Sequence, residues 1–169
     1  MINYIDVTDK WIKEAKPKSG KIAFANIVRS TEGIVYSQKN AILEYQNGED
    51  LEIGTWFKNN IWGDVKMQPS VKFPENVKSS DLLLLKNCPF FDEQTLEIKT
   101  VKSNRKDGLI RRLKEAREQS SNVLIDITDY PYDLDFVKHE INRYILNHKW
   151  LKTVCIKKHN KLAFACKSK

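Results

Sequence analysis

The chain of 169 residues is 41% hydrophobic and 10% aromatic, which is enough for one sizeable core and too little for two. Its 29 lysines and arginines outweigh 22 acids, and the net charge of +7 favours an acidic partner: nucleic acid, an anionic membrane surface or an acidic protein. Three widely spaced cysteines, Cys88, Cys155 and Cys166, form no Cys-x-x-Cys or Cys/His cluster, which argues against a disulfide framework and a cysteine-based zinc site.

No membrane segment is expected. The longest apolar runs fall well short of the roughly 18 to 20 residues that a membrane-spanning helix requires. The first six residues, MINYID, lack the basic start of a signal peptide. These features predict a chain that acts in a cytosol.

The first 46 residues form an N-terminal extension in this interpretation. Thr8 is expected to cap a short helix that Pro17 ends, and residues 21–28 and 33–36 have the composition of strands. Four lysines gather along this part of the chain and are expected to form a solvated surface: Lys13, Lys16, Lys18 and Lys21.

The second part, residues 47–169, is predicted to be the main domain. It opens on a helix that starts after Asn47 and ends at Gly63, with its apolar stripe on Ile53, Trp56 and Phe57. The segment 65–67 is a predicted strand, and residues 69–80 a loop. The remaining expected elements are strands at 81–85 and 95–101, a helix at 105–119, a strand at 123–127, a helix at 133–148, and a hairpin of 153–158 with 161–166.

This order of elements sets the expected fold class. One helix, three strands, a helix, a strand, a helix and two strands alternate in a way that is typical of an α/β protein. The prediction is a mixed central sheet flanked by helices.

A candidate site appears on the two strands that begin at Asp81 and Thr95. The period of two in a strand places Glu97 and Lys99 on one face and the apolar residues between them on the other. Asp81 heads the neighbouring strand and is expected to join Glu97 in holding a divalent cation, with Lys99 polarising a water or steadying a phosphate. This layout predicts a phosphodiesterase site.

Glu52 is a further candidate ligand. It stands with Glu49 and Asp50 near the start of the first helix, where acids also suit the positive end of the helix dipole. Its position beside the apolar stripe is expected to bring its carboxylate to the edge of the site. Asp126, within an apolar strand, is expected to belong to a hydrogen-bonded network.

A basic surface is predicted next to the site. It is either a platform for a phosphate backbone or a solvated helix whose charges pair in part with Glu115 and Glu118. Its candidate substrate-binding residues are Lys102, Arg105, Lys106, Arg111, Arg112 and Arg117.

Residues 47–169 resemble the C-terminal nuclease domain of CdiA contact-dependent growth inhibition toxins. The resemblance rests on residues 63–69, 74–83, 96–99 and 119–126. It extends to nuclease domains carried by phage-derived and mobile-element proteins of Gram-positive bacteria.

The resemblance implies the PD-(D/E)XK fold of restriction endonucleases. On that pattern Asp81 is the first acid, Glu97 the second, Lys99 the lysine and Glu52 the acid of the first helix, while Ser80 stands where the pattern has proline. These carboxylates would hold Mg²⁺, Mn²⁺ or Zn²⁺.

The resemblance also implies a biological role. The chain would be a toxin nuclease that cleaves RNA, tRNA included, in the cytoplasm of a target bacterium, as the C-terminal part of a larger secreted or surface protein. A cognate acidic immunity protein is expected to cover the basic helix, because dense positive charge steers an acidic partner.

Three other functions remain open at this stage. The first is a metal-independent RNase of the barnase, EndoU, colicin and RelE type, in which Lys99, Thr100, Arg105 and His159 would perform acid/base work. The others are a DNase toxin and a catalytically silent nucleic-acid-binding module in which Glu97 and Lys99 merely pair. Gln119 is a secondary candidate for orienting a phosphate or water, as are Thr100 and His159.

Overall fold

The computed structural model describes residues 48–68, 70–73, 80–84, 88, 91 and 94–169, together with the strand backbones 21–24, 27–28, 35–36 and 41–44. The helix expected after Thr8 and the side chains of the four N-terminal lysines lie outside the described residues.

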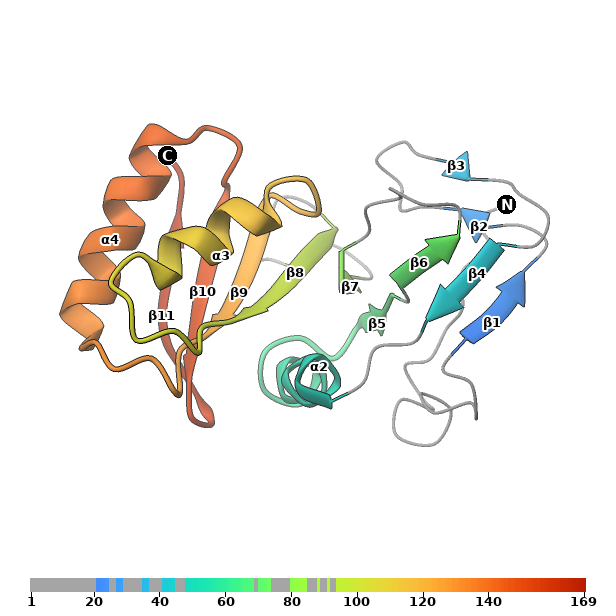
Figure 1. Ribbon diagram of the computed structural model, residues 1–169, viewed down its shortest axis with the longest axis horizontal. Coiled ribbons are helices and arrows are strands. Elements are labelled where there is room, and N and C mark those ends of the chain that lie inside the picture. Colours follow the sequence, from blue (N-terminus) through green and yellow to red (C-terminus); the bar gives the residue numbers. More distant parts are fainter. Residues whose placement is uncertain are drawn as a thin grey trace.

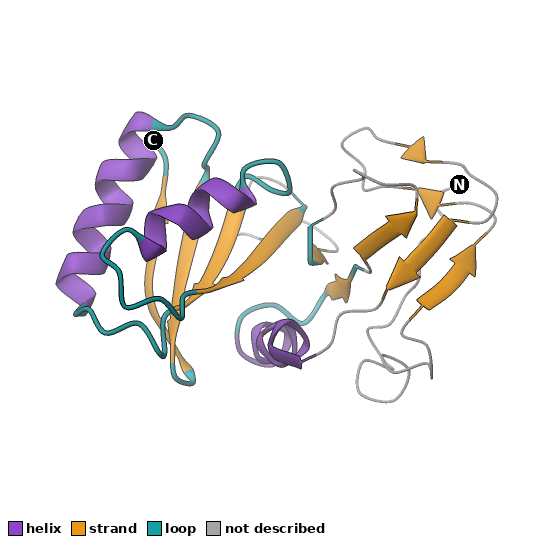
Figure 2. Ribbon diagram, viewed as in Figure 1, coloured by secondary structure: helices purple, strands orange, loops and turns teal. Residues whose placement is uncertain are grey.

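The largest sheet among the described residues is mixed and six-stranded, and it lies beside a smaller sheet of β1, β4 and β6 (Figures 1 and 2). Strands β8, β9 and β10 run parallel to one another, whereas β5, β7 and β11 pair antiparallel with their neighbours. In spatial order the strands are β11 (Lys161–Lys167), β10 (Thr153–Lys158), β9 (Asn122–Asp126), β8 (Thr95–Thr100), β7 (Leu82–Leu84) and β5 (Val65–Met67).

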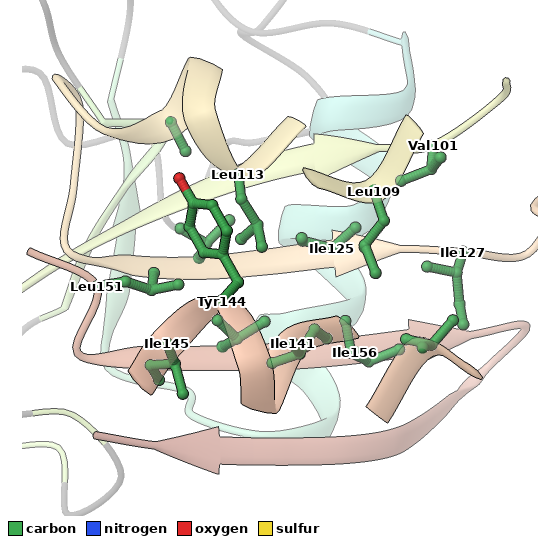
Figure 3. Close-up of a cluster of buried hydrophobic side chains, with 14 of the residues drawn as sticks. Val101, Leu109, Leu113, Ile125, Ile127, Ile141, Tyr144, Ile145, Leu151 and Ile156 are labelled. Carbon is green, nitrogen blue, oxygen red and sulfur yellow. The ribbon is translucent and has the colours of Figure 1, made fainter. Parts of the chain in front are cut away.

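Three helices cover the two faces of this sheet. Helices α3 (Gly108–Ala116) and α4 (Leu134–Asn147) lie on one face and α2 (Gly48–Asn60) on the other (Figures 1 and 3). Helix α3 connects the parallel strands β8 and β9, and α4 connects the parallel strands β9 and β10. Parallel neighbours require such crossover connections, which are usually helices. The expected α/β class, a mixed sheet flanked by helices, is confirmed.

Each face of the sheet has its own hydrophobic core. Leu109 and Leu113 of α3 and Ile141 of α4 pack on Ile125 and Ile156 of the central strands (Figure 3). On the opposite face, the apolar stripe of α2 packs against side chains of β5, β7, β8 and β9, among them Met67, Leu82, Leu96 and Leu124. Fully buried side chains on both faces explain why the strands read as continuous apolar runs.

The predicted C-terminal hairpin is present. His159 and Asn160 connect β10 and β11, and His159 adopts a positive φ of 52°, which a tight two-residue turn requires. Among the described helices, none combines the length and apolar character that a membrane crossing needs.

A strand occupies part of the segment that was predicted to be a loop. Residues Ser70–Phe73 form β6, which pairs with β4 (Ala41–Glu44), and β4 in turn pairs with β1 (Lys21–Phe24). Two further strands, β2 (Ile27–Val28) and β3 (Val35–Tyr36), pair with each other. The two flanking prolines concealed the alternation of polar and apolar residues in β6. As a result, a sheet crosses the expected boundary at residue 47.

Helix α3 is shorter than the predicted 105–119. The backbone bends at Arg105 and turns at 106–107, and two tyrosines from the loop after β9 hydrogen-bond to this segment. The Tyr130 hydroxyl donates to the Lys106 carbonyl at 2.8 Å, and the Tyr132 hydroxyl donates to the Asn104 carbonyl at 2.8 Å. These tertiary hydrogen bonds compete with helix formation for the same carbonyl groups.

Gly54 allows α2 to lie close to the sheet. A Cβ atom at this position would stand 3.2 Å from Met67 Sδ and 3.4 Å from Leu82 Cδ2. We expect Gly54→Val to lower the free energy of unfolding by about 1–3 kcal/mol, because the added methyl groups force α2 away from β5 and β7. Urea denaturation measures this change.

Gly63→Val is the matched control, since a Cβ at Gly63 meets only the Lys58 carbonyl oxygen at 3.9 Å. Its midpoint should stay near that of the wild type. Equal destabilisation by both variants would contradict the close packing of α2.

Candidate functional site

Two buried carboxylates, Asp81 and Glu97, lie beside each other at the junction of β7 and β8. Leu82 pairs with Leu96 in an antiparallel register, so the residue before Leu82 comes opposite the residue after Leu96. Asp81 is 7% exposed and Glu97 1% exposed. Asp81 Oδ2 accepts a hydrogen bond from the Ile98 backbone N–H at 2.8 Å. The structure therefore places these two acids beside each other, as the sequence predicts.

The segment before β7 fixes the backbone of Asp81. The Gln68 backbone N–H donates to the Asp81 carbonyl at 2.7 Å, and Gln68 Nε2 donates to Ser80 Oγ at 2.8 Å. The Ser80 hydroxyl donates in turn to the Leu82 carbonyl at 3.3 Å. Ser80 thus anchors this turn through hydrogen bonds at the position where the PD-(D/E)XK pattern has proline.

Burial disfavours the charged form of both acids. Burial raises the pKa of Asp81 to about 6, against the opposing effect of the Ile98 hydrogen bond. Burial and then the neighbouring charge of Asp81 raise the pKa of Glu97 to about 9. Such a pair of perturbed carboxylates is a feature of functional sites.

Lys99 completes the predicted trio. Its ammonium group forms an ion pair with Glu97 Oε1 and donates a hydrogen bond to Gln119 Oε1 at 3.2 Å. Glu97 and Lys99 pair in register with Val123 and Ile125, whose side chains lie in the core under α3 and α4, so both point to that face of the sheet.

A hydrogen-bond network places Gln119 at this point. Ser120 follows it, and Ser120 Oγ lies 2.9 Å from Thr95 Oγ1 and donates to the Thr95 carbonyl at 2.9 Å. Asn122 Nδ2 donates to the same carbonyl at 3.0 Å. The end of α3 is therefore tied to the start of β8, which brings Gln119 to Lys99.

Asp50, and not Glu52, is the acid of α2 that approaches this site. The charge of Asp50 raises the pKa of Asp81, and burial raises the pKa of Asp50 itself while Lys99 opposes that rise. Glu52 is exposed and lines a different cavity. Two residues that are two positions apart in a helix differ by a rotation of about 200° around the helix axis, so they lie on nearly opposite sides of the helix. Asp50 and Glu52 therefore cannot both face the same site. Asp50 was recognisable, since it precedes Ile53 by three residues.

The residues fit a divalent cation of the Mg²⁺ type. Glu97 Oε2 is buried beside the Asp81 carboxylate and receives no hydrogen bond from the described residues. Within the described ranges, no three His, Cys, Asp or Glu side chains converge on one metal position. Mg²⁺ commonly binds one or two carboxylates and completes its coordination shell with water and phosphate oxygens. Asp81 and Glu97 provide two such carboxylates.

The predicted basic surface is partly ion-paired. Lys102 pairs with Glu49 at 2.6 Å, Arg105 with Asp107 at 3.0 Å and Arg112 with Glu115 at 2.6 Å. The side chains of Lys106, Arg111 and Arg117 are exposed on or beside α3. Exposed ion pairs contribute about 0–1 kcal/mol, so these cations remain available to exchange partners.

Thr100 and His159 meet in a second cavity, away from Lys99 and Arg105. They line it together with Asp126 and Lys157. Asp126 is hydrogen-bonded as expected, to Thr128 and to Lys157. The four residues of the metal-independent alternative therefore do not gather in one place, because Lys99 and Thr100 are consecutive in β8 and face opposite sides of the sheet.

Comparisons of the chain with protein-family models, with curated proteins and with solved structures find no significant match.

Replacing Glu97 with Gln should stabilise the metal-free protein at alkaline pH. Because the pKa of Glu97 rises from 4.5 to about 9 on folding, the folded state holds a proton that the unfolded chain releases between these values. Stability therefore falls as pH rises through this window, and a glutamine cannot lose that proton. In EDTA at pH 8 we expect Glu97→Gln to gain about 1–3 kcal/mol over the wild type, with the gain vanishing near pH 4.

Urea denaturation at pH 4, 6 and 8 measures the gain. Glu115→Gln, which alters an exposed acid on α3, serves as the control and should show no growing advantage. A Glu97→Gln protein that is less stable than the wild type at pH 8 would contradict the raised pKa of Glu97.

Proposed function

We propose that this protein is a metal-dependent nuclease that hydrolyses phosphodiester bonds. The observation that carries the proposal is the buried pair of Asp81 and Glu97 with Lys99 on the same strand face. A protein gains no stability from burying two adjacent carboxylates, so their retention calls for a functional reason.

The arrangement of elements supports a PD-(D/E)XK core. Helix α2 precedes the antiparallel strands β5, β7 and β8, and α3 then leads to β9, which runs parallel to β8. This matches the order that the resemblance to CdiA toxin nuclease domains implies. The added strand β6 belongs to the other sheet and leaves this order within the central sheet intact.

Each side chain of the site has a role in this proposal. Asp81 and Glu97 would hold the ion, which when bound would neutralise charge at a phosphate oxygen and lower the pKa of a water. Lys99 lies beside Glu97 and steadies the attacking water or the charge that develops on the phosphate. Gln119 orients the Lys99 ammonium, and Asp50 adds negative charge at the edge of the site.

The charge distribution supports a nucleic-acid substrate. A net charge of +7 and the exposed cations around α3 favour a phosphate backbone. The preference for RNA, tRNA included, and the role as a bacterial toxin with an acidic immunity protein rest on the resemblance. In this proposal the immunity protein covers α3 and the adjoining site.

The test is cleavage of total RNA and of plasmid DNA by the purified chain, with Mg²⁺ or Mn²⁺ and with EDTA. We expect RNA cleavage that EDTA abolishes. Asp81→Asn, Glu97→Gln and Lys99→Met should each lower the rate by about 10²–10³-fold, because each removes charge stabilisation of the transition state. Asp135→Asn, an exposed acid at the start of α4, is the control with wild-type activity.

A second readout is independent of cleavage. Mn²⁺ should raise the melting temperature of the wild type and not of Asp81→Asn, since a ligand stabilises only the state that binds it. EDTA-resistant RNA cleavage would support a metal-independent RNase. Cleavage of plasmid DNA and not of RNA would identify a DNase. If RNA and DNA both stay intact at protein concentrations that bind them, the chain is a nucleic-acid-binding module without nuclease activity.

A further inference from the structure

A second cavity opens on the α2 face of the sheet, at the carboxyl ends of β8, β9 and β10. Its volume is about 400 Å³, within the range of about 300–1,000 Å³ of small-molecule sites. The carboxyl ends of parallel strands are where α/β sheets commonly bind ligands. The residues that line this cavity include Glu52, Trp56, Thr100, Asp126, Lys157 and His159.

A buried ion pair forms one wall of this cavity. Lys157 Nζ donates to Asp126 Oδ2 at 2.5 Å, and the two residues are 8% and 7% exposed. The other oxygen, Asp126 Oδ1, accepts from the backbone N–H and the hydroxyl of Thr128 at 2.8 and 2.5 Å. A buried ion pair seldom stabilises a fold more than apolar residues would, so stability alone does not account for this one.

Lys157 has donor capacity to spare. An ammonium group carries three N–H donors, and Asp126 is the one acceptor among the described residues to which Lys157 hydrogen-bonds. The Trp56 ring lies 5.6 Å from Nζ, where it makes a cation–π contact. A ligand in the cavity that presents an acceptor to Lys157 would use a remaining donor.

The wall formed by α2 provides a negatively charged hydrogen-bond acceptor. The Glu52 carboxylate is exposed and has no hydrogen-bond or ion-pair partner among the described residues. On the floor, Thr100 Oγ1 is buried and also lacks a partner within the described ranges. The cavity therefore combines the remaining donors of Lys157, the Glu52 carboxylate and the Thr100 hydroxyl, with two further acids, Glu49 and Asp129, in its lining.

Two flat rings complete the lining, Trp56 from α2 and His159 from the hairpin turn. The His159 backbone N–H donates to Thr128 Oγ1 at 2.9 Å, which ties the turn to the residue that also binds Asp126. Aromatic rings in polar pockets are the surfaces on which unpaired nucleobases stack.

We propose that this cavity binds an unpaired guanine of the substrate strand, an inference that rests on the proposed nuclease function. Guanine presents an acceptor, O6, beside two neighbouring donors, N1–H and N2–H₂. Lys157 would donate to O6, while the Glu52 carboxylate accepts from N1–H and N2–H₂ in the bidentate manner that suits planar groups. Adenine and cytosine place an acceptor next to a single amino group, and uracil has one ring N–H. None of these bases therefore has two adjacent donor groups that could bind both oxygens of the Glu52 carboxylate.

The two sites draw on neighbouring residues of α2 and of β8. The first turn of α2 brings Asp50 toward Asp81 and Lys99, and it contributes Glu52 to the cavity. In β8, Lys99 and Thr100 are consecutive and serve one site each. Glu97 and Lys99 face the α3/α4 side of the sheet and the cavity opens on the α2 side, so a strand with its phosphate at Asp81 and Glu97 would pass around the carboxyl end of β8 to present a base to the cavity.

Mononucleotide binding tests the pocket without relying on cleavage, because these probes have no phosphodiester bond. Calorimetric titration of the full chain with GMP, IMP, AMP, CMP and UMP in EDTA should give the tightest binding for GMP. AMP should bind at least about tenfold more weakly, and IMP, which lacks the 2-amino group, should fall between them.

Glu52→Gln should reduce GMP affinity about tenfold and leave AMP affinity unchanged, because one charge-assisted acceptor is lost. Asp135→Asn should bind GMP like the wild type. Lys157→Met, checked for folding by circular dichroism, should also lose GMP affinity. Equal affinity for GMP and AMP, or unchanged GMP binding by Glu52→Gln, would overturn the pocket.

Cleavage of single-stranded RNA separates the two proposals. Oligonucleotides with one guanosine should be cut near it, and inosine in its place should slow the cut in the wild type and not in Glu52→Gln. Metal-dependent cleavage without base preference or GMP binding would overturn the pocket and leave the nuclease standing. GMP binding without any cleavage would support the pocket and count against the nuclease.

Discussion

Two carboxylates held beside each other out of water are the constraint on which the rest of this structure depends. Asp81 and Glu97 repel each other when charged, and burial removes the solvent that would screen them. The pairing of Leu82 with Leu96 brings the two residues opposite each other, and the hydrogen bond from the Ile98 backbone N–H holds the Asp81 carboxylate in place. In the proposed function a bound cation would offset this repulsion, because its positive charge favours the ionised form of both carboxylates.

Helix α2 links the two polar sites of the molecule. Its apolar stripe buries Ile53 and Phe57 against the central sheet, and Gly54 permits the close approach. The acids of its first turn then diverge, with Asp50 on the side of the carboxylate pair and Glu52 on the side of the cavity. One packed element therefore sets the geometry of both sites, and a shift of α2 would disturb them together.

Prediction succeeded where local pattern is strong and failed where tertiary pairing decides. The apolar runs of β7 and β9 and the hairpin around His159 were recognisable because period, composition and turn chemistry agree. Strand β6 was missed, since its pairing with β4 lies 26 or more residues away along the chain and its flanking prolines indicate a loop. The sequence favours Glu52 because it lies next to the first residue of the apolar stripe, whereas the spacing of three residues between Asp50 and Ile53 indicates the acid that the structure brings to the site.

The amino-acid pattern alone establishes the α/β class, the shared strand face of Glu97 and Lys99, and the excess of positive charge, because these follow from the strand period and from counting. Long-range packing establishes the rest. It brings Asp81 to Glu97, Gln119 to Lys99, and Asp126 to Lys157, contacts between residues 16 to 31 positions apart. No local rule contains these pairings, since each depends on strand register and on where a crossover helix returns to the sheet.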